Sequence, residues 1–504
     1  MDSIRIEGEL NDVPGDAGNK RLSETTYVYD ALDRLIKTKV KFFDPNSQNG
    51  IGDGKVVTIT EYNGNSQVVR VINDNGHETT SSYDTAHRLS VVTDAKGNIA
   101  AYSYDQNSNV LTIIEVEKSD MGSPDEDFVT TNMYDNLDRL TGTTDNDENP
   151  HTYDYDSRDN RTLVIDALTH KTRYEYDGLN RLIQTVRDMN NNGANPADPC
   201  DIVTYQTWDD NSRLISRSDD NGNPTAYVYD ALNRQTSEQY ADGTLNSSTY
   251  DVHDNCLTFI DANGSKVIRT YDLLNRPTNK TIVRGANIED TTFERYEYDG
   301  LSRMVSAEDN DSLVTFSYDS LSNPISETLN GRTTARVYDG VGNQTQITYP
   351  GGRIINISPD ELSRKKTIED TNETIATYNY IGGRVEKREY GNGIDTDYTY
   401  DNVKRIIGTT HTKTVGGVII DKRTYQWDAN YNKIQRRDER IGGPQLTHKY
   451  TYDPIYRLEH TTMTGAGAIL VRDTDYDLDG VGNFLTNTLL LAATSWAAQS
   501  ILIR

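Results

Sequence analysis

The sequence predicts an all-β protein in which tandem β-hairpins wind into a spiral sheet that forms part of a hollow shell or tube. A Tyr-x-Tyr-Asp phrase returns along most of the chain, and the commonest step between copies is 21 residues. Turn-forming clusters separate short runs rich in aromatic and β-branched residues, which favour strands. A period kept over this many copies is typical of a repeat architecture, in which each unit packs against its neighbours.

The phrase is clearest at residues 174–183, which read Tyr-Glu-Tyr-Asp-Gly-Leu-Asn-Arg-Leu-Ile, and it returns at residues 227–234 and 296–303. Degenerate copies occur at residues 62–63, 359–360 and 380–381. We expect the second aromatic residue of each phrase and the Asp after it to be structural repeat residues. The predicted pairs are Tyr29 and Asp30, Tyr83 and Asp84, Tyr104 and Asp105, Tyr134 and Asp135, Tyr155 and Asp156, Tyr176 and Asp177, Trp208 and Asp209, Tyr229 and Asp230, Tyr250 and Asp251, Tyr271 and Asp272, Tyr298 and Asp299, Tyr318 and Asp319, Tyr338 and Asp339, Tyr400 and Asp401, Trp427 and Asp428, Tyr452 and Asp453, and Tyr476 and Asp477.

One unit can be followed from residue 98 to residue 116. Residues 99–104 predict a strand, residues 105–109 a turn, and residues 110–116 a return strand. Turns between units often read Asp-x-x-Gly, as at residues 94–97, where Gly supplies the positive φ that closes a hairpin. Two strands of about six residues and two turns of about four account for the period.

The chemistry of the phrase predicts a structural role. We expect each Tyr to pack on its counterpart one repeat away, with roughly 0.5–1.5 kcal/mol for each aromatic pair. The Asp is expected to accept backbone N–H groups at the turn, and the Arg four residues later, such as Arg181 or Arg234, to pair with that Asp. A catalytic site is rarely copied this many times, so no catalytic residue is predicted and the chain is not expected to be an enzyme.

The array is predicted to cover residues 25–488, preceded by a lead-in at residues 1–24. The apolar residues 489–504 lack the phrase and are expected to form a short helix or frayed end at a truncated terminus. Longer steps predict loop insertions, rich in turn formers, near residues 41–55, 117–128, 188–202, 282–291, 411–421 and 438–446. About 20 hairpins give about 40 strands, and an open twisted sheet rarely exceeds about ten strands without curling.

Composition narrows the function classes. Hydrophobic residues make up 34% of the chain, and 33 of these residues are Tyr. This composition suits a thin apolar layer behind a sheet better than a thick core. The net charge of −27 argues against nucleic acid as a partner, because nucleic-acid binding needs basic patches. No apolar run is long enough to span a membrane, and residues 1–10 do not resemble a signal peptide. The two cysteines, Cys200 and Cys256, lie outside any CxxC motif, and whether they pair is left open.

No cofactor or metal site is predicted. Residues 188–193 match the first half of an EF-hand loop, but its twelfth position, where calcium needs a bidentate Glu, is Pro199. The Asp-Pro-Asn sequence at residues 44–46 is a weaker match. The eight histidines are scattered without a zinc-binding spacing.

The phrase Tyr-Asp-x-Leu-Asn-Arg-Leu, alternating with Tyr-Asp-x-x-Gly-Asn as at residues 338–343, resembles the YD repeats of the RHS family. Related repeats occur in the shells of Tc-type toxin complexes and in teneurins. The resemblance implies a hairpin spiral around a hollow space, a possible enclosed polypeptide cargo, and a secreted or cell-surface location. Such proteins typically carry a self-cleaving segment with a D-P-x-G-type motif and then a toxin. This chain shows neither, so we expect a non-catalytic shell fragment.

Two alternatives remain open at this stage. Aromatic hairpin repeats of about 20 residues also occur in carbohydrate-binding arrays, in which exposed Tyr faces would hold a cell-surface glycan. A β-propeller with two units to each blade would need about ten blades, more than the usual four to eight. The Asn-Arg-Leu after Tyr-Asp favours the RHS pattern over the carbohydrate-binding array, and the recurring Gly-His signatures of a propeller are missing.

Overall fold

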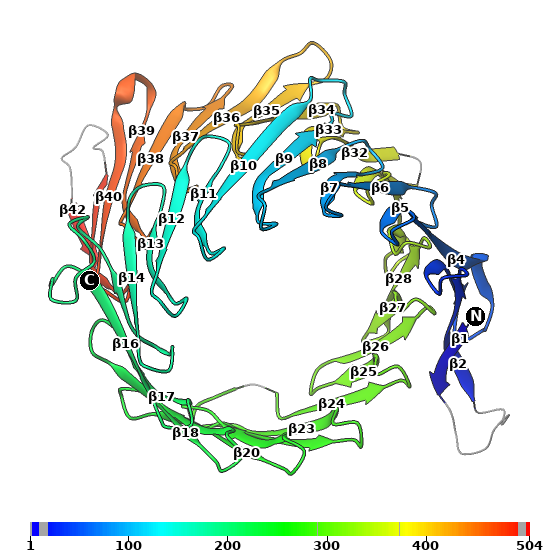
Figure 1. The fold of residues 1–504 in the computed structure, drawn as a ribbon, viewed down its shortest axis with the longest axis horizontal. Coiled ribbons are helices and arrows are strands. Elements are labelled where there is room, and N and C mark those ends of the chain that lie inside the picture. Colours follow the sequence, from blue (N-terminus) through cyan, green and yellow to red (C-terminus); the bar gives the residue numbers. More distant parts are fainter. Residues whose placement is uncertain (1–2, 10–18, 290, 372, 492–499, 504) are drawn as a thin grey trace. The chain divides into compact units, whose positions relative to one another are not determined.

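The computed structural model describes residues 3–9, 19–289, 291–371, 373–491 and 500–503, and these residues form an all-β fold. They contain 42 strands and a single 3-10 turn at Ala466–Ala468. Most strands pair antiparallel with their neighbours in the chain, as Figure 1 shows for β23, β24 and β25. The prediction of tandem β-hairpins is therefore confirmed. No helix of the described chain is long and apolar enough to cross a membrane.

The chain divides into two compact units, residues 1–100 with 245–378 and residues 101–244 with 379–504. The strands of the first unit are β1 (Ser3–Glu9), β2 (Lys20–Tyr29), β3 (Leu35–Phe43), β4 (Gly50–Tyr62), β5 (Val68–Ile72), β6 (Glu78–Tyr83), β7 (Leu89–Thr93), β20 (Leu245–Tyr250), β21 (Cys256–Ile260), β22 (Lys266–Tyr271), β23 (Pro277–Val283), β24 (Phe293–Tyr298), β25 (Met304–Glu308), β26 (Leu313–Tyr318), β27 (Pro324–Leu329), β28 (Arg332–Tyr338), β29 (Gln344–Thr348), β30 (Ile354–Pro359) and β31 (Lys365–Asp370). The chain passes from one unit to the other within β8 (Ile99–Tyr104), between residues 244 and 245, and within β32 (Glu373–Ile381).

The strands of the second unit follow the same short antiparallel pattern. They are β9 (Val110–Glu117), β10 (Glu126–Tyr134), β11 (Leu140–Thr144), β12 (Pro150–Tyr155), β13 (Arg161–Ile165), β14 (Lys171–Tyr176), β15 (Leu182–Arg187), β16 (Ile202–Trp208), β17 (Leu214–Ser218), β18 (Pro224–Tyr229), β19 (Gln235–Gln239), β33 (Arg384–Tyr390), β34 (Ile394–Tyr400), β35 (Ile406–Lys413), β36 (Ile419–Trp427), β37 (Lys433–Arg440), β38 (Leu446–Tyr452), β39 (Leu458–Thr464), β40 (Leu470–Leu478), β41 (Phe484–Leu491) and β42 (Ser500–Ile503).

A β-bulge recurs at the second aromatic residue of the phrase. In the β18–β19 hairpin, Val228 pairs with Ser237 but Tyr229 pairs with Gln235, so one residue of β19 is left over. The same shift precedes Tyr29, Tyr134 and Trp427. Bulges twist a strand and fix its register. Val228 is 56% exposed between two better-covered tyrosines, so the Tyr side chains lie on the more protected side of the hairpin.

The buried apolar side chains are few, as the composition predicts. Several of them lie at or beside the insertions. Phe42, Phe43 and Val56 are buried in the first unit, whereas Phe128, Val186 and Ile202 are buried in the second.

Two predictions about local structure are corrected. Residues 489–491 belong to strand β41, not to a helix, because the β41 backbone pairs along β40, and residues 500–503 form β42. Residues 492–499 and 504 of that predicted tail lie outside the described residues. The insertions at 41–55, 411–421 and 438–446 largely lengthen their hairpins instead of forming surface loops. Both cysteines are free thiols.

Candidate functional site: the Tyr-Asp turn and the lateral contacts

In all copies of the phrase but the last, the Asp organises the turn that follows it. Asp230 Oδ1 accepts the backbone N–H groups of Leu232 at 2.9 Å and Arg234 at 3.0 Å, and its Oδ2 accepts Arg234 Nε at 2.7 Å. The Arg234 backbone N–H, helped by its side chain, holds the pKa of the Asp230 carboxyl below its ordinary value. Ionised carboxylates form the stronger class of hydrogen bond, so this arrangement fixes the turn.

Other copies repeat this geometry with either Arg or Asn as the partner. Asp177 bonds to Arg181 Nε at 2.6 Å, while Asp339 bonds to Asn343 Nδ2 at 2.8 Å. The turns between units use the same arrangement, since Asp94 accepts two backbone N–H groups and Asn98 Nδ2. Asp319 differs because it is fully buried, and burial raises the pKa of its carboxyl.

In most copies, the second aromatic residue reaches back to the preceding unit. The Tyr229 hydroxyl donates to the carbonyl oxygen of Leu214 at 2.8 Å, and Tyr155 donates to Leu140 in the same way at 2.8 Å. Trp208 uses its indole N–H for the equivalent bond to Leu182, also at 2.8 Å. The acceptor is always the backbone of the preceding return strand in these copies.

Arginine, and not stacked tyrosine, lies on these aromatic rings. The Arg213 guanidinium carbon lies 5.2 Å from the ring centre of Tyr229, and its Nη1 donates to the Asp230 carbonyl at 3.3 Å. Arg303 makes the same two contacts with Tyr318 and Asp319, at 4.8 and 2.9 Å. The predicted Arg–Asp pair therefore exists, but the arginine also joins one turn to the next. The prediction of Tyr–Tyr stacking along the array is corrected in these copies to cation–π contact.

The last predicted pair is also corrected. Asp479, not Asp477, accepts the turn N–H groups of Val481 and Asn483, and the bulge falls between Asp477 and Leu478. Leu478 thus takes the position of the second aromatic residue, and the visible Tyr476-Asp477 lies two residues too early. Among the degenerate copies, Asn63 and Asp360 keep the turn geometry.

Within each unit, distant hairpins touch through what we call lateral contacts, hydrogen bonds and ion pairs between residues 256–290 apart in the chain. Two of them are equivalent. In the first unit Asn75 Nδ2 donates to Asp339 at 3.0 Å, and in the second Asn221 Nδ2 donates to Asp479 at 2.8 Å. The residue after each of these Asp is Gly, and a Cβ there would overlap the carboxylate of Asp74 or Asp220.

Three consecutive repeats of the second unit carry bulky residues at a turn position with positive φ, where most copies have Asn, Asp or Ser. They are Lys404, Tyr431 and Tyr456, with φ of 69°, 66° and 69°. Lys404 Nζ lies 2.9 Å from carboxylate oxygens of Glu115 and Glu117. A bulky side chain is unusual at positive φ, so its presence here needs a compensating contact.

The two tyrosines make matching lateral contacts with acidic turn residues. Tyr431 donates to Asp145 Oδ2 at 3.1 Å, and Tyr456 donates to Asp166 Oδ2. Burial, together with the adjacent carboxylate of Asp145, raises the pKa of Tyr431 to about 12. Both hydroxyls therefore stay protonated as donors at neutral pH.

Arg384, at the start of β33, carries a positive charge embedded in a lateral contact. It bonds Glu117 at 2.7 Å and Glu126 at 2.5 Å, and it lies over the rings of Phe128 and Tyr400 at 4.9 and 4.6 Å. Nearby, the backbone N–H of Asp120 donates to the Tyr380 carbonyl at 2.7 Å. The insertion at residues 117–128 is thus part of a lateral contact.

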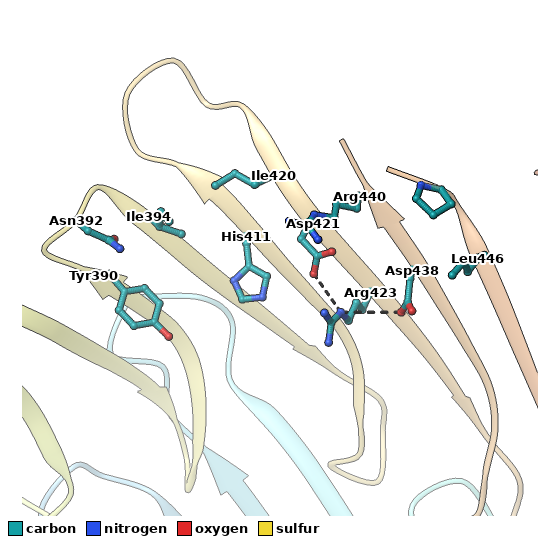
Figure 2. Close-up of a pocket in the computed structure, with 11 residues that line it drawn as sticks. Tyr390, Asn392, Ile394, His411, Ile420, Asp421, Arg423, Asp438, Arg440 and Leu446 are labelled. Atoms are coloured by element: carbon teal, nitrogen blue, oxygen red, sulfur yellow. Dashed lines mark ion pairs between the residues drawn. The ribbon is translucent and has the colours of Figure 1, made fainter. Parts of the chain in front are cut away.

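An open groove of about 650 Å³ lies on β33–β38 of the second unit, away from the Tyr-Asp turns. Figure 2 shows Arg423 between Asp421 and Asp438, with ion pairs of 3.1 and 3.9 Å. Tyr390 and His411 line the same groove. Since Arg423 lies two residues from Tyr425 on β36, the groove occupies the side of the sheet that bears the repeat tyrosines.

The RHS Repeat family model matches residues 62–99, 155–188 and 208–245. The chain therefore carries RHS repeats in these three stretches. No curated protein matches it. Among solved structures, the RHS-repeat chain is similar to a chain of the TcdB2-TccC3-Cdc42 crystal structure, with 11% identity and a TM-score of 0.40 over 99% of this chain and 33% of that chain. A chain of the Photorhabdus luminescens Tc holotoxin pore matches 99% of this chain and 32% of its own length, with 13% identity and a TM-score of 0.35. The RHS-repeat chain therefore spans about a third of these toxin chains.

The lateral contacts are the part of the site that the sequence analysis missed. A sequence signal for some of them existed, because Lys404, Tyr431 and Tyr456 break the preference for small polar residues at their turn position. The partners, 286 or more residues earlier in each tyrosine case, carry no signal of their own.

Proposed function

We propose that the chain is a non-catalytic wall segment of a shell that encloses a polypeptide cargo, in a secreted or surface-displayed system. The lateral contacts are the observation that carries this proposal. In a straight repeat array, each unit contacts only its neighbours. Here, in both units, turn residues contact hairpins 256–290 residues further along.

That separation of 256–290 residues corresponds to about 12 to 14 units of 21 residues, after which the chain runs beside itself. A sheet edge otherwise offers unpaired groups to other chains. The lateral contacts join turn to turn instead, through side chains such as Asn75, Asn221 and Arg384. Rows of hairpins that are joined side by side in this way can enclose a cargo better than an open array can.

The repeat residues also favour a structural role. The two oxygens of Asp230 accept three donors from its own turn, and the Tyr229 hydroxyl is committed to a backbone carbonyl. Such groups are not available as acid, base or nucleophile.

Small-angle X-ray scattering of the full chain tests the proposal. A compact globule of 504 residues would have a radius of gyration of about 23 Å, and a wall around a cavity must exceed it clearly. Arg384→Ala should increase the radius further, because it removes a lateral contact. Arg336→Ala is the matched control, since Arg336 pairs with Glu327 on the adjacent strand. A radius near 23 Å, or equal effects of the two variants, would contradict the proposal.

The groove of Figure 2 favours a second candidate function, binding of a carbohydrate. Its aromatic ring, Tyr390, lies with charged hydrogen-bonding groups such as Asp421 and Arg423, the combination that sugar hydroxyls and their apolar faces require. A glycan array with the wild type and Arg423→Ala tests it. Binding lost in the variant supports this function, and an array without binding by the wild type rejects it.

A further inference from the structure

The insertion between β15 and β16 combines buried acids with a run of amide side chains. Residues 188–201 read Asp-Met-Asn-Asn-Asn-Gly-Ala-Asn-Pro-Ala-Asp-Pro-Cys-Asp. Asp188 is 1% exposed and Asp201 is 4% exposed, at the two ends of the loop. Val186 and Ile202, just outside them, are buried as well, so the loop stands on a well-packed base.

Of the two carboxylate oxygens of Asp188, one accepts a hydrogen bond and the other accepts none. Its Oδ2 accepts the backbone N–H of Gly193 at 2.7 Å, which closes the first half of the loop. Its Oδ1 is buried and has no hydrogen-bond partner. A buried carboxylate oxygen without a partner is costly, because it has lost its water and gained nothing in exchange. The residue therefore calls for a cation or donor beside Oδ1.

The other acids of the loop fix its shape without neutralising this charge. Asp201 accepts the backbone N–H groups of Met189 at 3.0 Å and Asn195 at 2.8 Å. Among the described residues, no Lys, Arg or His forms an ion pair with Asp188, Asp198 or Asp201. Three carboxylates in 14 residues thus lack a protein cation.

The amide side chains of Asn190 and Asn192 converge on Asp198. Their Nδ2 atoms lie 2.9 and 2.8 Å from Asp198 Oδ2. An Asn side chain exposes a nitrogen and an oxygen of nearly the same shape, so a half-turn of the amide exchanges donor for acceptor. After that exchange three oxygens would face one another, which is favourable only with a cation between them.

We propose that residues 188–198 bind a single Ca²⁺ through Asp188 Oδ1, the side-chain oxygens of Asn190, Asn192 and Asp198, and backbone carbonyls of the loop. Asp188, Asn190, Asn192 and Gly193 hold positions one, three, five and six of an EF-hand loop, and the Asp188–Gly193 bond makes its sharp turn. Asp198, one residue before Pro199, supplies the late carboxylate that the twelfth position lacks.

Calcium is the metal that fits this donor set. It accepts six to eight oxygen ligands, neutral ones included, in a flexible geometry, whereas Zn²⁺ prefers nitrogen and sulfur. Among the described residues no group of three or more His, Cys, Asp or Glu side chains is placed to hold a metal ion. The site therefore depends on amide and carbonyl oxygens. With few charged ligands, its affinity belongs with that of extracellular modules, on the order of 10⁻⁴–10⁻³ M.

Titration calorimetry and thermal melts of the full chain with CaCl₂, after treatment with a chelator, test the proposal. The wild type should bind one Ca²⁺ and melt at a higher temperature in its presence. Asp188→Asn should weaken binding by at least about tenfold and abolish the calcium-dependent shift. Asp44→Asn is the matched control, because both oxygens of Asp44 already have partners, Asn46 N at 2.8 Å and Ser47 Oγ at 3.0 Å. An unresponsive wild type, or equal binding by Asp188→Asn, would overturn the site.

Asn192→Asp gives a test that does not depend on the folding of the Asp188 variant. Without calcium it places a second carboxylate beside Asp198, so the melting temperature should fall. With calcium the added charged ligand should restore stability and tighten binding by about tenfold. A loop held only by hydrogen bonds predicts the same loss with no rescue by calcium, and that outcome would reject the proposal.

Discussion

At the scale of single residues, one short phrase builds three kinds of contact. The Asp closes its own turn, the aromatic residue bonds to the preceding return strand, and the Arg joins successive turns. The sequence predicted the turn-forming role of Asp because its spacing to Arg and Asn is local. It did not predict the position of the Arg over the next ring, because that contact depends on the twist of one hairpin against another.

Tyr229→Ala is expected to lower the free energy of unfolding by roughly 2–3 kcal/mol, less than for a fully buried aromatic residue because Tyr229 is only half-buried. Tyr229→Phe should cost about 1 kcal/mol, since it removes only the hydrogen bond to Leu214. Urea unfolding of the two variants measures both values.

Tyr205→Ala is the control for this pair, because Tyr205 is 47% exposed on β16. Its substitution should change stability by less than about 0.5 kcal/mol. Equal effects at Tyr205 and Tyr229 would mean that the repeat tyrosine does not hold the units together.

At the scale of elements, a hairpin turn serves two purposes, closing its own strands and contacting a distant hairpin. The sequence indicates some of the turns that contact a distant hairpin, because these turns carry Lys404, Tyr431 and Tyr456. The terminal strand β41 shows the opposite case. Its Leu-rich sequence allowed a helix, and pairing with β40 decided for a strand, a tertiary effect that local propensity does not contain.

Gly340→Ala should destabilise the protein by about 1–3 kcal/mol, as overpacking of a close contact does. A Cβ at Gly340 overlaps the side chain of Asp74, which belongs to the partner hairpin in the lateral contact. Gly178 is the matched control, because it follows Asp177 at the same turn position and has nothing within 4 Å of its Cβ direction. Thermal melts should show a lower melting temperature for Gly340→Ala only. Equal melting temperatures for the two variants would show that the lateral contact is loose.

The turns also predict an acid sensitivity. Hydrogen bonds from Arg139 and Arg181 hold the pKa values of Asp135 and Asp177 below the ordinary value of 3.8, and that of Asp479 falls to about 2, mainly through Asn483 and then Asn221. A carboxyl with a depressed folded pKa stabilises the fold above its unfolded pKa, and this stability is lost as the pH falls through the folded value.

The melting temperature should therefore be nearly constant from pH 7 to about pH 5 and fall steeply between about pH 4 and pH 2. Asp319, with its raised pKa, works in the opposite direction but is one group among many. Circular dichroism melts across this range provide the measurement. A melting temperature that is unchanged or higher at pH 3 would show that the turn carboxylates do not control stability.

At the scale of the whole molecule, the number of units and the return of the chain beside itself are different kinds of information. The period and the copy number follow from the sequence, because every copy contains a recognisable form of the phrase. The offset at which distant hairpins meet depends on the curvature that accumulates over about 12 to 14 units of small rotations. No single residue determines this accumulated curvature. The sequence therefore predicted winding only because the number of strands is too large for an open sheet.

The fixed offset leads to the last prediction, that the number of units between two lateral partners matters more than their sequence. Residues 229–249 form one 21-residue unit, and Asn75–Asp339 and Asn221–Asp479 lie on either side of it in the chain. Deleting residues 229–249 should shift these partners out of register by one hairpin. Replacing them with a copy of residues 250–270, which has the same length and starts at the same point of the phrase, should preserve the register. Hydrogen exchange in the turns at residues 339–343 and 479–483 should be faster in the deletion and unchanged in the replacement. Equal exchange rates in both variants would contradict this prediction. They would indicate a linear stack, in which the loss of one unit leaves the contacts between the remaining neighbours intact.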